Sequence, residues 1–334
     1  MTDHSWTPGK ILETSGYHWK TATLHAAVQL DLFSVLDGRQ ITAREAAEAC
    51  GSDTDGTERL LNALAAMDLV NKTGQNYANT DAAQKYLSRH SGEYLGHIIS
   101  HHHHLVPAWA RLDQAVAKGE PVRKQGPQAD ETQRRSFLMG MHNLARQVAP
   151  RAAAHVDLGG CRRLLDLGGG PGTHAIYFCL ENPGLNAVVA DLPATRPYAE
   201  ENIAEYGLSG RISFAPLDYT AEKISGQYDA AWLSHILHGE GPENCRNILR
   251  KTVSALIPGG KILVHDFILD NTRAAPLFPA LFSLNMLVNT DSGRAYSERE
   301  ITEMLSESGA EQIKRLDFCG PNDSGIIEGI APRG

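Results

Sequence analysis

The chain has 334 residues, of which 42% are apolar and 21% charged, and its formal net charge is −8 at pH 7. This length favours two domains, and the composition is that of a folded globular protein. The acidic balance, without any run of lysine or arginine, argues against a nucleic-acid partner, because such a partner requires positive charge opposite its phosphates.

The cysteines and the apolar segments limit the class of protein further. The five cysteines are widely spaced and include no CxxC pair, so we expect neither a disulfide framework nor a zinc site. No apolar stretch approaches the roughly 18 residues of a membrane span, and the first residues, MTDHSWTPGK, lack the apolar core of a signal peptide. The sequence predicts a cytoplasmic protein that binds a small molecule and no membrane.

The N-terminal region is predicted to be helical with one hairpin. Apolar positions at helical spacing predict a helix from about Leu24 that stops at Gly38. Thr42 and Glu45 form a capping box for a second helix, and Thr57 is the expected cap of a third. The segment LVNKTGQNYANT then predicts two short strands around a turn.

A helix–turn–helix followed by a hairpin is the winged-helix pattern, which raises the possibility of a transcription regulator. The predicted helix that begins at Thr57, which would read the DNA, offers Arg59 beside Glu58 and Asp68, where a reader of the major groove needs several basic and amide side chains. We therefore assign residues 1–105 to a winged-helix-like dimerisation domain.

Residues 106–160 are predicted to be a helical linker with a polar break, GEPVRKQGPQADE, and they lead into the rest of a second domain, 106–334. The four consecutive histidines His101–His104 point in different directions on a helix, so no metal site is predicted there. From residue 161 onward, five short apolar strands alternate with helical patterns. This alternation predicts an α/β fold with a Rossmann-like, doubly wound, mostly parallel sheet.

A glycine-rich motif, LLDLGGGPGTH, follows the first of these strands. A dinucleotide loop, as in a nicotinamide oxidoreductase, requires G-x-G-x-x-G, and here Thr173 stands at the third glycine position. A phosphate loop requires a lysine that is absent. The pattern present is D-x-G-x-G-x-G, formed by Asp166, Gly168, Gly170 and Gly172. These glycines allow a sharp turn and a close approach of a ligand to the backbone.

Two further aspartates end the next two predicted strands, at the edge where open α/β sheets bind ligands. Asp191 in VVADLP suits a ribose diol, Asp218 in APLDYT suits an adenine amino group, and Asp166 suits an ammonium group. A ligand with these three groups and no pyrophosphate is S-adenosylmethionine, which is the cofactor we expect.

Four segments in this order, LLDLGGGPG, DLP, LSHILHGEGPENC and PGGKILVHDFILD, resemble S-adenosylmethionine-dependent O-methyltransferases of the hydroxyindole, caffeate and bacterial polyketide type, over roughly residues 20–320. The resemblance implies a homodimer whose N-terminal domain is exchanged with the partner and helps to close the active site. It also implies cofactor contacts in the glycine loop and at five further positions: Asp191, Leu192, Asp218, Tyr219 and Ser234.

Histidine has the basicity needed to accept a proton from a hydroxyl group near neutral pH. His235 and His238 follow the fourth strand, and the resemblance makes His238 the base and His235 a wall of the acceptor pocket. Asp266 ends the fifth strand, which neighbours the fourth in a doubly wound sheet, so it is the candidate that orients His238. His265 is expected to pack on the opposite face.

Two departures from plant relatives stand out. Gly239-Glu240 follows the histidine where they have Asp-Trp, and Ala295 falls about where they carry a second acid. The predicted reaction is O-methylation of a small aromatic or polyketide-like acceptor, with C- or N-methylation, or cofactor binding without methyl transfer, as alternatives. The expected acceptor contacts, besides His235, are Met139, His142, Asn285, Met286 and Asn289.

Overall fold

The computed structural model describes residues 5–122 and 131–333, so most of the predicted polar break lies outside the described residues. The chain forms two compact units: Met1–Leu105 with Arg135–Asn143, and Val106–Arg134 with Leu144–Gly334. Within the described ranges, no helix is both long enough and apolar enough to cross a membrane.

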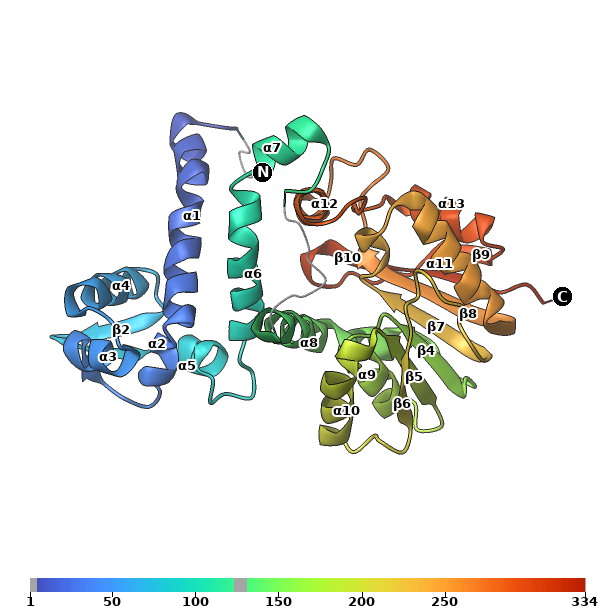
Figure 1. The fold of residues 1–334 in the computed structure, drawn as a ribbon, viewed down its shortest axis with the longest axis horizontal. Coiled ribbons are helices and arrows are strands. Elements are labelled where there is room, and N and C mark those ends of the chain that lie inside the picture. Colours follow the sequence, from blue (N-terminus) through green and yellow to red (C-terminus); the bar gives the residue numbers. More distant parts are fainter. Residues whose placement is uncertain (1–4, 123–130, 334) are drawn as a thin grey trace. The chain divides into compact units, whose positions relative to one another are not determined.

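The first unit has the helix, turn, helix and hairpin order that the sequence predicts (Figure 1). Its three short strands form an antiparallel sheet in the order β1-β3-β2. The elements are α1 (Pro8–Gln29), α2 (Leu32–Val35), β1 (Ile41–Thr42), α3 (Ala43–Cys50), α4 (Thr54–Ala66), β2 (Val70–Thr73), β3 (Asn76–Asn79), α5 (Asp81–Leu87) and the first part of α6 (Gly96–Trp109).

Two local expectations in this unit are wrong. The single helix expected up to Gly38 is interrupted between α1 and α2, where Asp31 has the left-handed φ of 55°. Thr57 does not cap α4: the Asp53 carboxylate accepts from Gly56 N at 2.8 Å and starts the helix one turn earlier. The capping box of Thr42 and Glu45 at α3 is confirmed.

The second unit contains the predicted doubly wound sheet, with seven strands in the order β6-β5-β4-β7-β8-β10-β9. The five expected strands are confirmed and pair in parallel, whereas β10, which was not predicted, runs antiparallel to both of its neighbours. The strands are β4 (Arg163–Leu167), β5 (Asn186–Asp191), β6 (Ile212–Pro216), β7 (Tyr228–Ser234), β8 (Leu256–Phe267), β9 (Glu311–Arg315) and β10 (Ser324–Ile330).

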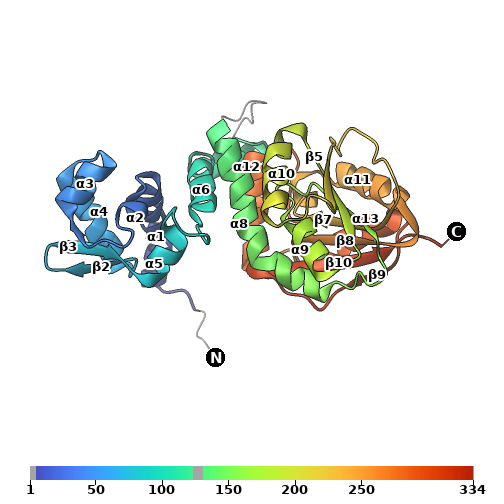
Figure 2. The same cartoon turned by 90° about the horizontal axis from the view of Figure 1, so that it is seen from below.

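Helices cover both faces of this sheet, as Figure 1 and Figure 2 show. Side chains alternate along each strand, so Leu164 belongs to one buried apolar cluster and Leu165 to the other. The first cluster includes α9 (Thr173–Glu181), α10 (Arg196–Glu205) and the end of α8 (Glu131–His155), and the second includes α11 (Pro242–Ser254) and α13 (Glu298–Glu307). Two further helices, α7 (Leu112–Lys118) and α12 (Leu277–Asn289), pack on each other through Ala115 and Val288.

Candidate active site

The glycine motif forms a tight loop between β4 and α9. Gly168, Gly170 and Gly172 have φ values of 65°, 53° and 73°, which is backbone that other residues rarely adopt, and Gly172 is the N-terminal cap of α9. A Cβ on Gly168 would also lie 2.5 Å from Cγ2 of Ile236. Glycine is therefore required here both for the turn and for the packing of the loop on the chain that follows β7. Thr173, at the position of the missing third glycine, is the first residue of α9.

Asp191 holds this loop at the carboxyl end of β5. Its carboxylate accepts from Gly170 N at 2.8 Å and from Leu192 N at 2.6 Å, and Thr195 Oγ1 lies 3.3 Å away. Burial raises the pKa of Asp191 although these hydrogen bonds oppose the shift. The neighbouring Leu192 side chain is half exposed. The two residues thus lie beside the glycine loop, where the sequence places a cofactor contact.

Asp218 and Tyr219 follow the next strand, β6. The Asp218 carboxylate accepts from the Thr220 hydroxyl group and from Thr220 N at 2.9 Å, and these hydrogen bonds lower the pKa of Asp218. The Lys251 ammonium donates to the carbonyl oxygens of Tyr219 and Thr220 and so holds this turn in place. The Tyr219 ring would touch a Cβ on Gly168 at 3.2 Å, so the turn lies next to the glycine loop.

Asp166, at the end of β4, differs from these two residues because it is 1% exposed. Oδ2 accepts from Ala175 N at 3.2 Å, whereas Oδ1 has no hydrogen-bond partner in the described part of the chain. Burial raises the pKa of Asp166 to about 7. A Cβ on Gly169 would lie 2.6 Å from Cγ of Asp166, so the carboxyl group is directly under the loop.

His238 and Asp266 come together at the adjoining ends of β7 and β8, as the strand order predicts. His238 Nδ1 donates to Asp266 Oδ1 at 2.7 Å, and Phe267 N donates to the same oxygen at 2.8 Å. Burial alone would raise the pKa of Asp266, but the positive charge that His238 and His235 can carry and the hydrogen bond from His238 outweigh it and lower the pKa well below its usual range. Asp266 therefore remains a carboxylate that can orient His238.

His235 also faces this carboxylate. It has a left-handed φ of 57° and precedes the 3-10 turn Leu237–Gly239, so the two histidines do not share a helical face. Its Nδ1 nevertheless lies 3.4 Å from Asp266 Oδ1, and 27% of its side chain is exposed, against 13% for His238. His235 is thus a second imidazole beside one carboxylate, and its role as a pocket wall stays a prediction.

Three phenylalanines that the sequence analysis missed surround the two histidines. The Phe267 ring centroid lies 4.4 Å from that of His235, and the Phe282 centroid lies 4.7 Å from that of His238. Phe278 completes the group at 4.8 Å from Phe267. Phe278 and Phe282 are one turn apart on α12, a spacing visible in the sequence, but periodicity alone does not show which face of that helix meets the histidines.

Ser234, an expected cofactor contact, is part of a mostly buried row of hydrogen-bonded polar side chains. Its Oγ lies 3.2 Å from His174 Nε2 and 2.9 Å from His265 Nδ1, and His265 Nε2 lies 3.1 Å from Ser324 Oγ. Burial lowers the pKa of His174 to about 3 and that of His265 well below its usual value, so both rings stay neutral. His265 is thus packed on the opposite face from Asp266. This row of hydrogen-bonded side chains connects α9, β7, β8 and β10.

The other expected acceptor contacts lie on two helices, α12 and α8. Asn285 accepts from Trp109 Nε1 at 2.9 Å and from Asn289 Nδ2 at 3.1 Å, and Met286 is buried next to them on α12. Met139 and His142 lie on the stretch of α8 that belongs to the other unit. Their contact with an acceptor stays a prediction.

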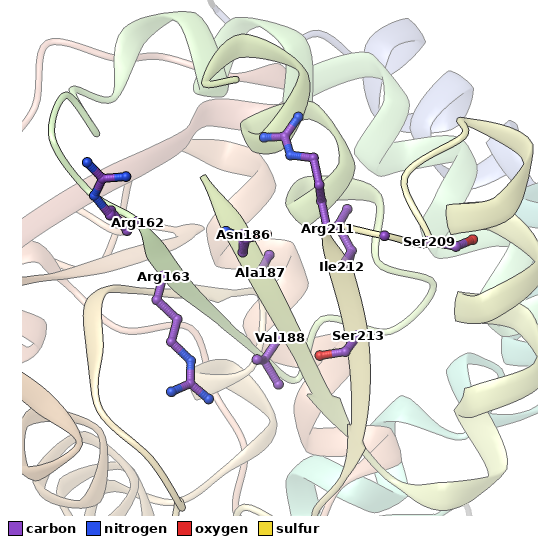
Figure 3. A pocket seen from close by; sticks show the side chains of 10 residues that line it. Arg162, Arg163, Asn186, Ala187, Val188, Ser209, Arg211, Ile212 and Ser213 are labelled. Carbon is purple, nitrogen blue, oxygen red and sulfur yellow. The ribbon is translucent and has the colours of Figure 1, made fainter. Parts of the chain in front are cut away.

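A depression with a volume of about 440 Å³ lies at the opposite edge of the sheet, where β4, β5 and β6 begin (Figure 3). Arginines contribute to its lining: Arg211 donates to the carbonyl oxygens of Cys179 and Leu185, and Arg163 lies over the Tyr228 ring. The depression is therefore separate from the carboxyl ends of the strands, where the glycine loop and the histidines lie.

The fold and the site together define a Rossmann-like protein that binds a nucleoside-type cofactor next to a histidine–carboxylate pair. The residues fit S-adenosylmethionine, which carries an ammonium group and a positively charged sulfonium. Gly170, where an added Cβ would meet nothing within 4 Å, leaves the loop backbone open to a ligand, and the buried Asp166 Oδ1 lacks a partner of opposite charge. Asp191 and Asp218 follow at the next two strand ends.

Comparisons with known proteins agree with this class. Residues 12–89 match the O-methyltransferase dimerisation domain and residues 113–311 match the O-methyltransferase domain. A 3-hydroxy-5-methyl-1-naphthoate 3-O-methyltransferase of Streptomyces sahachiroi is 34% identical, with 93% of this chain and 92% of that protein aligned. The tetracenomycin polyketide synthesis 8-O-methyl transferase TcmO of Streptomyces glaucescens is 32% identical over the whole of both chains. The solved structure of PigF with SAH, the Serratia methyltransferase, superposes with a TM-score of 0.90 at 25% identity, covering 97% of this chain and 100% of that one.

The chain belongs to the S-adenosylmethionine-dependent O-methyltransferase family, with the dimerisation domain and the catalytic domain of that family. The family also contains N- and C-methylating members.

Proposed function

We propose that this enzyme methylates a hydroxyl group on a small aromatic or polyketide-like acceptor, with His238 as the general base and Asp266 as the residue that orients it. The observation that carries the proposal is the 2.7 Å hydrogen bond from His238 Nδ1 to a buried, ionised carboxylate. Two relatives support the same substrate class: one is named for 3-O-methylation of a 3-hydroxy-5-methyl-1-naphthoate, and the other for 8-O-methylation in tetracenomycin polyketide synthesis.

The hydrogen bond to Asp266 determines which nitrogen of His238 acts as the base. A carboxylate only accepts, so the imidazole proton is on Nδ1 and the lone pair is on Nε2, which is free to accept a proton from the acceptor. A phenol with a pKa near 10 is a poor nucleophile at neutral pH, and a positioned base accelerates such a step by roughly 10²- to 10⁴-fold. The negative charge of Asp266 stabilises the imidazolium that forms.

Bound S-adenosylmethionine supplies an electrophilic methyl group on a sulfonium. The glycine loop with Asp191, and the Asp218–Tyr219 turn, would hold this cofactor at the carboxyl ends of β4, β5 and β6. Alignment of the attacking oxygen with the methyl group supplies much of the acceleration, up to about 7–11 kcal/mol in the best cases. Phe267, Phe278 and Phe282 would hold an aromatic ring beside His238 for that purpose.

The test replaces the base. His238→Ala is expected to lower kcat by about 10²- to 10⁴-fold while the Kd for S-adenosylmethionine, measured by calorimetry, stays the same. The exposed His90→Ala is the control and is expected to retain full activity.

The acceptor is found by incubating the enzyme with methyl-labelled cofactor and a metabolite extract, followed by mass spectrometry. Full activity of His238→Ala, or a label on nitrogen or carbon, would overturn the proposed role.

We also propose that two chains associate through the N-terminal domain. Apolar side chains on and just before α1 are exposed, including Trp6 at 68%, Leu12 at 72% and Trp19 at 72%. Such a row of exposed apolar residues marks an interaction surface in a globular protein. The double variant Leu12→Glu, Trp19→Glu is expected to sediment as a monomer where the wild type is a dimer. Dimers of the variant would exclude this face.

A further inference from the structure

The region around Asp266 has a second chemical capacity besides general-base catalysis. Of the described residues, His235, His238 and Asp266 form the one group of three ligand-type side chains whose donor atoms all lie within 4.8 Å of one another. Two imidazoles and one carboxylate are a common ligand set for divalent transition metals. The sequence analysis expects no more than a pocket wall at His235.

We propose that His235, His238 and Asp266 bind one divalent transition-metal ion of the Zn²⁺ type, and that the bound ion blocks methyl transfer. The binding step is independent of the function proposed above, whereas the inhibition rests on the role of His238 as base.

The separations of the donor atoms support a site of this kind. Zn²⁺ binds imidazole nitrogen and carboxylate oxygen at about 2.0–2.2 Å in a tetrahedron, so neighbouring ligand atoms lie about 3.3 Å apart. His235 Nδ1 and Asp266 Oδ1 are already 3.4 Å apart, and the 2.7 Å between His238 Nδ1 and the same oxygen would open by about 0.6 Å. Such a change requires a small rotation of the partly exposed His238 side chain.

The charge and exposure of the group favour a metal ion as well. Asp266 contributes a negative charge that is 3% exposed, while both histidines keep part of their side chains open to solvent. The His235 Nδ1 atom is buried and makes no well-aligned hydrogen bond within the described residues. Three protein ligands with an open fourth position resemble the arrangement of accessible zinc sites. Mg²⁺ and Ca²⁺ prefer sets of oxygen ligands, so we expect them to bind poorly.

The predicted inhibition follows from the valence of imidazole. A neutral imidazole has one lone pair and one N–H. If the lone pair of Nδ1 of His238 binds the metal, the ring proton must be on Nε2. That nitrogen can then no longer accept a proton from an acceptor hydroxyl. The ion would also occupy Asp266 Oδ1, which otherwise stabilises the imidazolium form of His238.

The first experiment titrates the wild-type protein with ZnCl₂ by calorimetry, and with CoCl₂ by visible absorption, because low-coordinate Co²⁺ absorbs more strongly than the hexaaqua ion. One saturable ion per chain is expected for each metal. Methyl transfer should fall in proportion to occupancy and return after EDTA is added. Absence of saturable binding to the wild type overturns the proposal without any variant.

The second experiment locates the ion. His235→Phe removes one ligand and places an aromatic ring beside Phe267. It is expected to weaken Zn²⁺ binding by at least about 10- to 100-fold, the loss that even changes to outer-shell partners cause. The matched control, His103→Phe in the four-histidine segment, should bind Zn²⁺ as the wild type does. Cofactor affinity of each variant checks its folding.

The outcomes separate this proposal from the proposed function. Unchanged Zn²⁺ binding by His235→Phe, or loss of binding in His103→Phe, places the ion elsewhere and overturns the site. Binding at the site with undiminished or increased methyl transfer overturns the inhibition and also contradicts His238 as the base. Weak methyl transfer in metal-free His238→Ala, measured separately, tests the base alone.

Discussion

Two buried aspartates at strand ends of the same sheet have opposite electrostatic properties. Asp166 on β4 is 1% exposed and Asp266 on β8 is 3% exposed. The pKa of Asp166 is raised to about 7 by burial, whereas that of Asp266 is lowered despite burial. Burial penalises both charges, so the difference comes from their partners.

The partners of Asp266 all come from the chain: His238, His235 and the backbone N–H of Phe267 surround it. Asp166 has one donor, Ala175 N, and one oxygen without a partner in the described residues. The Asp266 carboxylate therefore has its polar partners before a ligand binds. The carboxylate under the glycine loop lacks a positive partner, and we expect the cofactor to supply that charge.

The largest effect is expected at Asp266. Asp266→Asn keeps the shape but removes the negative charge that stabilises the His238 imidazolium, so kcat should fall by about 10²- to 10⁴-fold. The Kd for S-adenosylmethionine should not change. Steady-state kinetics with the exposed Asp270→Asn as control measures this. A variant with normal kcat, beside an inactive His238→Ala, would show that His238 needs no carboxylate.

The sequence predicts the surroundings of Asp266 better than those of Asp166. Strand order places His238 and Asp266 together because adjacent parallel strands end at the same edge. Whether a strand-end aspartate faces solvent or lies under its own loop depends on the packing of Gly169, which no pattern reports. The same limit explains the missed contact of the Phe282 ring with His238 and the wrong cap at Thr57, because Asp53, four residues earlier, is an equally good capping residue.

A smaller effect is expected at Asp166, where the quantity that changes is the stability of the protein and not kcat. Below about pH 4 the carboxyl is protonated in the folded and unfolded chains and costs nothing. As the pH rises from the ordinary value of 3.8 to about 7, the unfolded chain ionises first, and stability falls. Above pH 7 the folded chain carries the full penalty, on the order of a few kcal/mol at about 1.4 kcal/mol per pKa unit.

Asp166→Asn should therefore stabilise the cofactor-free protein at pH 8, and the gain should disappear towards pH 4. Thermal unfolding at both pH values measures this, with the exposed Asp291→Asn as control. Added S-adenosylmethionine should stabilise the wild type more than the variant, because the cofactor supplies the missing positive charge. An equal stabilisation of both proteins by the cofactor would mean that Asp166 does not interact with the positive charge of the cofactor.

The smallest effect is expected at Gly169, which covers Asp166. Its backbone does not need glycine, but an added Cβ would lie 2.6 Å from Cγ and Oδ2 of Asp166. Gly169→Ala should destabilise the protein by about 1–3 kcal/mol, as overpacking does. Gly184→Ala, where a Cβ meets nothing within 4 Å, is the matched control. If the collision with Asp166 is the cause, Gly169→Ala should cost much less in an Asp166→Ala background, and the coupling energy of this double-mutant cycle measures how far the loop itself keeps the carboxylate buried.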